Sequence, residues 1–433
     1  MKLLKPGLHL KRWLGVLLLG MVVVSLGIAY ALTEVYRGGT FPVWVQAVTL
    51  QFLPLLVRSA IFLLVGGVLC ALGLRGLYRS LEEGLPTPGN GHQSLLERIY
   101  DYRQRQGGPR IVCIGGGTGM PTVLRGLKSY SANITAIVTV GDDGGSSGRL
   151  RREHGILPPG DFRNNIVALA QVEPLMARLF QYRFGEGSPL GGHSFGNLFV
   201  LAMCGITGNF EQALRETSRV LAVQGTILPS TLQDVQICAD FIDGSHVCGE
   251  SQIPEVGRRI ERVRLEPDHP AAQPEAVRAI LEADLVVLGP GSLYTSVVPN
   301  LLVEGVAKAL IQSDAVKVYV CNVATQAGET DGYDVKAHVD ALVRHLPGRV
   351  NPLDVVLAPR HPDGAVSPDT EVELVYGAPL SDVTGPRILL EDVVRDDLAL
   401  RHDPDKLGAA LMRIYEEQRR VARVPNGAVR AAL

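Results

Sequence analysis

Residues 110–119 read Arg110-Ile111-Val112-Cys113-Ile114-Gly115-Gly116-Gly117-Thr118-Gly119, an apolar run of strand length that ends directly in a glycine-rich turn. The same arrangement occurs twice more, with a turn at 141–148 behind residues 134–140 and a turn at 289–292 behind residues 285–288. Loops behind the strands of an α/β sheet gather along one edge, where bare backbone N–H groups and helix N-termini surround an anionic phosphate. The three turns together predict a pocket for a nucleotide or a sugar nucleotide.

Strand-like and helix-like runs alternate along the chain after residue 109. Runs typical of strands lie at 110–114, 134–140, 285–288, 318–323 and 354–357, and runs typical of helices lie at 121–127, 162–170, 210–222, 301–311, 335–345 and 406–423. This spacing predicts an α/β fold, in which a mostly parallel, Rossmann-like sheet has flanking helices and right-handed crossovers. A hairpin expected between residues 233 and 250 interrupts the alternation, and we expect residues 188–264 to form an inserted lobe over the strand ends.

Two apolar runs precede this domain, from Trp13 to Leu32 and from Ser59 to Leu74. The first has about the 20 residues that a helix needs to cross a bilayer, and lysine and arginine residues bracket the outer ends of the pair. We therefore expect a two-helix transmembrane hairpin in the inner (cytoplasmic) membrane, with the soluble domain facing the cytoplasm. A cleaved signal peptide is the competing interpretation of the first run.

The predicted domain organisation has three parts. Residues 1–80 are expected to be a membrane anchor with two transmembrane helices, residues 81–108 a linker, and residues 109–425 the nucleotide-binding domain. The linker contains a short amphipathic helix that would lie near the membrane or dock on the soluble domain, or a solvated spacer instead.

The charge and the cysteine content narrow the classes of partner and compartment. A net charge of −2 gives no general basic field, so nucleic acid is not expected as a partner. The six cysteines form no CxxC pair, and free thiols in the core of a protein in a reducing compartment are expected rather than a disulfide framework or a zinc site. Cys238 and Cys248 are close in sequence, but a tight turn at Asp243-Gly244 would point them to opposite faces of a hairpin.

The second glycine turn carries two acids and two serines. Asp142 and Asp143 follow the strand at which a Rossmann protein places an acid for the ribose hydroxyls, and Ser146 and Ser147 add hydroxyl donors. The two carboxylates are candidates to hold either a ribose or a Mg²⁺ ion that bridges phosphates. Mg²⁺ is thus the one cofactor that the sequence suggests, with Asp142 and Asp143 as its ligands.

Two further glycine-rich segments lead into predicted helices. Arg163 and Asn164 lie in the first turn of one helix and would face an anion there, although the neighbouring Asp161 also suits a helix cap. His193 and Asn197 lie at the start of the next helix, where His193 would act as a general base, as a phosphate ligand, or only as a packing residue.

Candidate ligand contacts come from both halves of the predicted sheet, because the third turn and Asn322 follow strands of its second half. Contacts from both halves would enclose a two-part ligand. The full predicted set is Gly115, Gly116, Gly117, Thr118, Gly119, Asp142, Asp143, Ser146, Ser147, Arg163, Asn164, His193, Asn197, Gly289, Gly291, Ser292 and Asn322.

Several familiar site types are missing from the sequence. No Gly-Lys-Ser/Thr follows any of the glycine turns, which argues against a P-loop NTPase. A Ser-His-Asp nucleophile elbow, an HExxH motif and a cysteine nucleophile are also lacking, so a hydrolase of a familiar type is not indicated. The first turn departs from the dinucleotide fingerprint at Met120, where glycine or alanine is expected, and this disfavours an NAD-dependent oxidoreductase.

Five motifs, taken in order, resemble the CofD/YvcK family, and the likeness covers roughly residues 109–400. The motifs are residues 115–119, 139–149, 159–164, 192–197 and 289–295. The CofD branch transfers a 2-phospholactate group from a guanosine diphosphate-linked donor onto a deazaflavin precursor, with Mg²⁺. The YvcK-like branch, the gluconeogenesis factors, binds UDP-sugars such as UDP-N-acetylglucosamine and supports cell shape and growth on gluconeogenic carbon.

The chain is more similar to the second branch, through residues 142–148 and 325–333. The resemblance implies that Thr118 and the glycines beside it contact phosphates and that Asn197 and the Gly289 turn line the pocket, while Asn165 departs from the apolar residue expected there. We therefore expect a membrane-tethered, UDP-sugar-binding regulator of carbon metabolism and the cell wall that forms a homo-oligomer. A Mg²⁺-dependent phosphotransferase resembling 2-phospho-L-lactate transferase is the alternative.

Overall fold

The computed structural model describes residues 103–171, 174–361, 372–377, 385–397 and 400–423, together with isolated positions between residues 25 and 64. The chain divides into two compact units, Met1–Gln104 and Arg105–Leu433. The helices and strands whose bounds follow all lie in the second unit.

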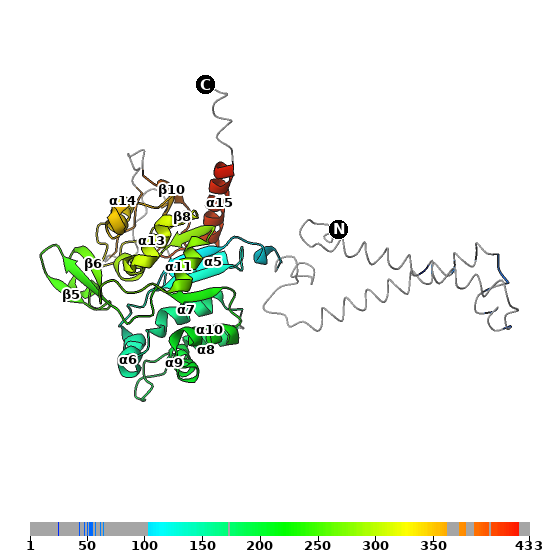
Figure 1. Cartoon of the computed structure of the whole chain (residues 1–433), viewed down its shortest axis with the longest axis horizontal. Coiled ribbons are helices and arrows are strands. Elements are labelled where there is room, and N and C mark those ends of the chain that lie inside the picture. Colours follow the sequence, from blue (N-terminus) through cyan, green and yellow to red (C-terminus); the bar gives the residue numbers. More distant parts are fainter. Residues whose placement is uncertain are drawn as a thin grey trace, which may run out of the picture. The chain divides into compact units, whose positions relative to one another are not determined.

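Seven parallel strands form the main sheet in the order β10-β9-β8-β7-β1-β2-β3 (Figure 1). Their bounds are β1 (Ile111–Gly115), β2 (Ile134–Val138), β3 (Thr226–Pro229), β7 (Leu285–Leu288), β8 (Val316–Val320), β9 (Val355–Pro359) and β10 (Arg387–Glu391). The chain runs outward from β1 to β3, returns to β7 beside β1, and then runs outward to β10 on the other side. β1 and β7 therefore flank a topological switch point, and the predicted Rossmann-like parallel sheet is confirmed.

The central strands are apolar throughout because helices cover both faces of the sheet. β1, β7 and β9 are buried at every position, as parallel strands between two helical layers must be. Right-handed crossovers that leave the switch point in opposite directions place their helices on opposite faces.

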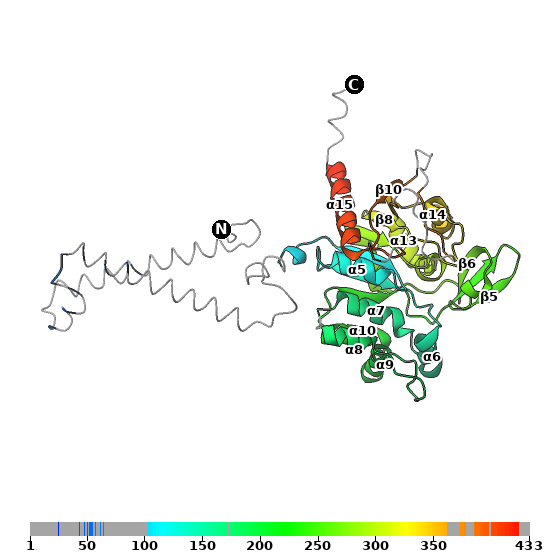
Figure 2. The ribbon, with the colours of Figure 1, turned by 180° about the vertical axis from the view of Figure 1, so that it is seen from behind.

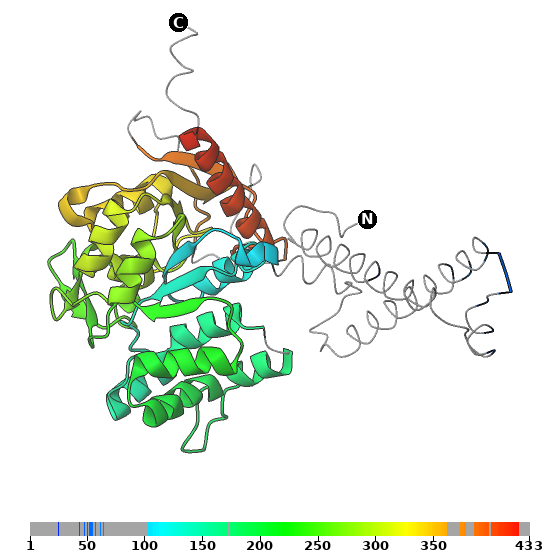
Figure 3. The ribbon, with the colours of Figure 1, turned by 45° about the vertical axis from the view of Figure 1, so that its right-hand side comes forward.

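On one face, α5 (Met120–Leu127) packs against α7 (Pro159–Leu169) and α15 (Pro404–Arg423), and α11 (Pro274–Leu281) packs with α13 (Glu304–Gln312) on the other (Figures 1 and 2). The remaining helical segments are α6 (Gly145–His154), α8 (Pro174–Gln181), α9 (Phe195–Thr207), α10 (Phe210–Val220), η2 (Pro254–Val256), the π-helical η3 (Leu293–Val297), α12 (Val298–Leu302), α14 (Val335–Arg344) and η4 (Pro347–Arg349). Figure 3 shows α15 beside β10 at one end of the sheet.

The predicted inserted lobe, residues 188–264, is not a single insertion. Its first part supplies α9 and α10, after which the chain enters β3 of the main sheet. Only then does it form a second, antiparallel sheet in the order β5-β4-β6, with bounds β4 (Gln236–Phe241), β5 (His246–Cys248) and β6 (Ile260–Glu266). β3 escaped prediction because it is a four-residue edge strand that ends in proline, a residue that edge strands tolerate.

Cys238 and Cys248 lie directly opposite each other on β4 and β5 and form a disulfide, so the prediction that they face apart was wrong. The Phe241 N–H donates to the Ser245 carbonyl, which leaves a three-residue loop where a two-residue turn was assumed. A shift of one residue in register moves a strand's side chains to the other face. Cys113, Cys204 and Cys321 are free and buried, as expected for core thiols.

The predicted transmembrane hairpin is contradicted, and with it the predicted location in the cytoplasmic membrane. Within the residues that the structure describes, no helix has both the length and the apolar character needed to cross a bilayer. The two predicted spans, residues 13–32 and 59–74, lie almost entirely outside those residues. An apolar run of the right length is a necessary condition for a span, and it is not a sufficient one.

Candidate functional site

The first and third glycine turns touch each other at the switch point. They follow β1 and β7, which are neighbours in the sheet, so both emerge at the same edge. A Cβ atom added to Gly119 would lie 2.4 Å from the carbonyl oxygen of Pro290, so the two backbones meet where only glycine fits. Asn322, which follows β8, extends the contact: it accepts from the Gly291 N–H at 3.1 Å and donates to the Gly291 carbonyl at 2.9 Å.

A cleft of about 730 Å³ opens beside this contact. It is lined by Thr118, Gly119, Thr122, Pro290, Gly291, Ser292, Asn322, Val323, Ala324, Thr325, Gln326, Val372, Asp396, Asp397, Leu400, Arg401 and His402. Five of the predicted site residues are therefore brought together here, namely Thr118, Gly119, Gly291, Ser292 and Asn322. Backbone amides, hydroxyl groups and one amide side chain form the wall next to the sheet.

Arg401 and His402 complete the opposite wall, and no pattern in the sequence marks them. Arg401 is exposed and forms no ion pair within the described part of the chain, whereas Asp396 pairs with Lys406 and Asp397 with Arg395. The Nε2 of His402 lies 3.1 Å from the Cys321 carbonyl, and burial lowers the pKa of His402 to about 4. His402 is therefore neutral, with a proton on Nε2 and an acceptor lone pair on Nδ1.

A cluster of carboxylates lies on the other side of the first glycine turn. The Gly117 N–H donates to Asp161 Oδ2 at 2.6 Å, and the Gly144 N–H donates to Asp142 Oδ1 at 3.0 Å. Asp161 thus binds the glycine turn and is not the cap of its own helix, whose N-cap residue is Pro158.

The acids of this cluster raise one another's pKa values. Burial raises the pKa of Asp142 and brings the pKa of Asp161 to about 6, with Asp142 adding to the shift of Asp161. Glu250, from the turn after β5, joins them: burial, and then the charges of Asp142 and Asp143, raise the pKa of Glu250 to about 8. Such mutual repulsion is what a bound cation or a shared proton relieves.

The predicted metal pair, Asp142 and Asp143, has divided partners. Asp143 turns toward the small sheet, where its Oδ1 accepts from the Ser251 N–H at 2.9 Å, while Asp142 stays beside Asp161. Among the residues that the structure places, the one group of three or more side chains with ligand atoms within 4.8 Å of one another is elsewhere, on the small sheet. A Mg²⁺ site in the acidic cluster stays a prediction, and the geometry favours Asp161 over Asp143 as the partner of Asp142.

The remaining predicted residues form a buried network that does not line the cleft. Ser146 Oγ lies 2.9 Å from His193 Nδ1 and accepts from Asn197 Nδ2 at 3.0 Å, and all three side chains are buried. Burial lowers the pKa of His193, which is then a neutral packing partner and not a base aimed at a ligand. The network joins α6 to α9.

Arg163 and Ser147 fix the neighbouring helix α7 in the same way. The guanidinium of Arg163 donates to Ser194 Oγ and to Asn164 Oδ1, and the Gly160 N–H donates to Ser147 Oγ at 3.1 Å. These contacts position the helix that carries Asp161. Asn165, which departs from the resemblance, is fully buried.

Glu329 holds the third turn to the segment after β8. Its carboxylate accepts from Thr295 Oγ1 at 2.8 Å, from the Tyr294 N–H at 3.2 Å and from Gln326 Nε2 at 3.0 Å. Burial raises the pKa of Glu329 to about 7. The sequence offered Glu329 only as part of a family-like stretch, without a role.

Comparison with known proteins places this architecture. The family model for 2-phospho-L-lactate transferase CofD matches residues 111–374, which include all three glycine turns. A putative gluconeogenesis factor from Nostoc is 44% identical over 430 residues, which are 96% of this chain and 92% of the relative. The chain belongs to the gluconeogenesis factor family. The predicted resemblance is confirmed.

Other members of the gluconeogenesis factor family match mainly the second unit. The gluconeogenesis factor of Bacillus subtilis is 45% identical over 319 residues, covering 71% of this chain and 99% of the relative. A crystal structure of a UPF0052 family protein from Bacillus halodurans is similar with a TM-score of 0.65 and 44% identity, covering 70% of this chain and 99% of that chain. The CofD-like, Rossmann-like domain is thus shared, and the cleft lies within it.

Proposed function

We propose that this gluconeogenesis factor is a regulatory protein that binds a nucleotide-activated sugar of the UDP-N-acetylglucosamine class in the cleft at the switch point. The observation that supports this most directly is the backbone contact between Gly119 and Pro290, which brings two glycine turns to one wall of the cleft. Ligands of open α/β sheets bind at such a point, outside the carboxyl ends of the strands.

The lining of the cleft suits a diphosphate joined to two polar groups. Thr118 and Ser292 offer hydroxyl donors beside bare amides, and Arg401 offers a cation without an ion-pair partner in the described residues. The volume of about 730 Å³ lies in the range of roughly 300–1,000 Å³ that small-molecule pockets occupy. The diphosphate would lie against the turns, with the base and the sugar on either side.

A regulatory role agrees with the relatives' printed name, gluconeogenesis factor, which describes a process and not a reaction. We propose that ligand binding couples carbon metabolism to the supply of cell-wall precursors and so to cell shape. We also propose that the chain forms a homo-oligomer and does not bind nucleic acid; light scattering of the purified protein tests the first point.

The full-length protein should be stabilised by UDP-N-acetylglucosamine and not by NAD or by GDP with Mg²⁺. A ligand that binds only the folded state at about 100 times its Kd adds about 2.7 kcal/mol to the free energy of unfolding, and thermal melting detects this. Arg401→Ala and Thr118→Ala should each weaken binding about tenfold in calorimetry, because each removes a phosphate contact worth about 1.4 kcal/mol.

Lys308→Ala is the matched control for this test, since Lys308 is an exposed cation on α13 that pairs with Glu304. It should leave the affinity unchanged. Stabilisation by GDP and Mg²⁺ without any response to the UDP-sugar would contradict the proposal, as would unchanged affinity in both cleft variants.

The acidic cluster supports a second candidate function, a Mg²⁺-dependent phosphotransferase of the CofD type. Asp142, Asp161 and Glu250 fit a hard cation, because burial and mutual repulsion raise their pKa values and a divalent ion would relieve both. When bound, Mg²⁺ would neutralise charge that develops on a transferred phosphoryl oxygen. Asp161 itself orients the first glycine turn through the Gly117 N–H.

Under this second function, Asp161→Asn should weaken Mg²⁺ binding at least tenfold in the presence of GDP. The variant keeps an oxygen that accepts from the Gly117 N–H, so the turn should stay in place. Asp143→Asn is the comparator and should have a much smaller effect, because Asp143 faces Ser251. Isothermal titration with Mg²⁺ measures both; an equal loss in the two variants would return the site to the Asp142 and Asp143 pair.

A further inference from the structure

One face of the small β5-β4-β6 sheet carries a set of thiol, imidazole and carboxyl side chains. Side chains alternate between the two faces of a strand, so Cys238 and Asp240 of β4, His246 and Cys248 of β5, and Glu266 of β6 lie on the same face. The odd-numbered residues of β4 belong to the hydrophobic core. This face is therefore free of a packing role on three adjacent strands.

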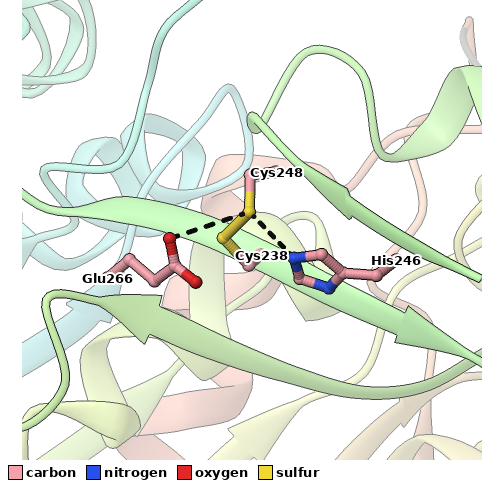
Figure 4. A group of neighbouring side chains, drawn as sticks. All are labelled: Cys238, His246, Cys248 and Glu266. Atoms are coloured by element: carbon pink, nitrogen blue, oxygen red, sulfur yellow. Dashed lines mark hydrogen bonds between the residues drawn. A yellow bond between two sulfur atoms is a disulfide. The ribbon is translucent and has the colours of Figure 1, made fainter.

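The four ligand atoms that this face offers lie close together (Figure 4). The sulfurs of Cys238 and Cys248, a ring nitrogen of His246 and a carboxylate oxygen of Glu266 all lie within 4.8 Å of one another. Cys248 Sγ is 3.2 Å from His246 Nε2 and 4.0 Å from Glu266 Oε2. Zn–S bonds of about 2.3 Å and Zn–N bonds of about 2.0 Å place neighbouring ligands of a tetrahedral ion about 3.3–3.8 Å apart, so small movements suffice.

Asp240 orients the imidazole for such a site. Its Oδ1 lies 2.8 Å from His246 Nδ1, so the carboxylate holds the proton on Nδ1 and leaves the Nε2 lone pair directed toward Cys248. Carboxylate partners of this kind fix the tautomer of metal-binding histidines and raise their basicity. A histidine that only filled a surface position would not need this arrangement.

We propose that this face binds a zinc ion when its two thiols are reduced, through Cys238, Cys248, His246 Nε2 and Glu266. The donor set of two sulfurs, one nitrogen and one oxygen suits a tetrahedral zinc ion. The disulfide between Cys238 and Cys248 is the alternative state, because a sulfur that is bonded to its partner cannot also act as a thiolate ligand.

Arg264 is the group that must move for the ion to bind. Its guanidinium pairs with Glu266 and lies 2.9 Å from His246 Nε2, which is the position that the metal would take. Zinc with two thiolates and one carboxylate carries a net charge of −1, and the displaced guanidinium would remain beside the site to balance it.

The test uses full-length protein reduced with a phosphine, which breaks the S–S bond to give two thiols and takes an oxygen from water to become the phosphine oxide. Anaerobic titration with Zn²⁺ against a chromophoric chelator should give one tightly bound ion per chain. Cys248→Ser and His246→Gln should weaken zinc binding at least 100-fold, and Asp240→Asn, which acts through His246, about 10- to 100-fold. Cys204→Ser removes a thiol on α9 and should leave the affinity unchanged.

Cobalt provides a second measurement that does not depend on stability. Co²⁺ in the reduced protein should give a thiolate-to-cobalt charge-transfer band that Cys248→Ser diminishes and Cys204→Ser retains. The proposal is overturned if reduced protein binds zinc no more tightly than Cys248→Ser does, or if His246→Gln has no effect. Since this site does not line the cleft, its failure would leave the proposed nucleotide-sugar binding untouched.

Discussion

Gly119→Ala should lower the free energy of unfolding by about 2–3 kcal/mol and abolish binding of the nucleotide sugar. The backbone of Gly119 is in the right-handed helical region, which alanine adopts without strain, so the effect comes from space alone. The added Cβ would lie 2.4 Å from the Pro290 carbonyl oxygen, 2.7 Å from its carbon and 2.9 Å from the Gly291 nitrogen. All three are backbone atoms that cannot rotate away, so the two turns must separate and widen the wall of the cleft.

Gly205→Ala is the matched control for this substitution. Gly205 lies in α9, and a Cβ atom added there would have nothing within 4 Å, so alanine should be neutral or should stabilise the helix by up to about 1 kcal/mol. Thermal melting and calorimetry with UDP-N-acetylglucosamine measure both variants. If Gly119→Ala melted like the parent protein and bound ligand equally well, the first and third turns would not be in contact.

The contact at Gly119 belongs to the part of the site that the sequence could predict. Strand-like runs followed at once by glycine turns are local patterns, and the carboxyl ends of parallel strands meet at one edge whatever the rest of the chain does. Thr118, Gly291, Ser292 and Asn322 were therefore predicted, and they line one cleft. This step needed only that β1 and β7 be neighbours.

The residues that the sequence did not reveal depend on contacts between distant segments. Arg401 reaches the cleft from the loop before α15, and Glu250 reaches the acids from the turn after β5; neither lies in a pattern that marks it. His193 has the opposite history, because a glycine-rich helix start suggested a ligand contact and the fold buries it against Ser146. Cys248 was misplaced because the Asp-Gly pair does not fix the length of its loop.

Glu250→Gln should make the protein more stable than the parent at alkaline pH, by about 2 kcal/mol at pH 9. The pKa of Glu250 rises on folding from 4.5 to about 8, because burial and the charges of Asp142 and Asp143 disfavour its ionised form. A carboxyl with a raised folded pKa stabilises the fold fully below its unfolded pKa, and this stabilisation is lost as pH rises through the folded pKa. The window for Glu250 therefore runs from about pH 4.5 to pH 8.

The size of the effect follows from this window. Each pKa unit corresponds to about 1.4 kcal/mol, and water that reaches the half-buried carboxyl reduces the full shift to about 2 kcal/mol. Glutamine keeps the shape of the protonated acid and cannot ionise, so the gap between the two proteins should be small at pH 5 and grow toward pH 9. Asp161 and Glu329, with pKa values near 6 and 7, leave a weaker slope in the variant.

Urea unfolding of full-length protein at pH 5, 7 and 9 measures this gap, and Glu255→Gln, which removes an exposed carboxyl from η2, serves as the control with no such trend. A gap that is constant with pH would show that Glu250 ionises as freely in the fold as in the unfolded chain. Mg²⁺ separates the two candidate functions in the same experiment. If the ion binds among Asp142, Asp161 and Glu250, it should close the gap at pH 9 by stabilising only the parent, whereas a cleft that binds a UDP-sugar without a metal leaves the gap unchanged.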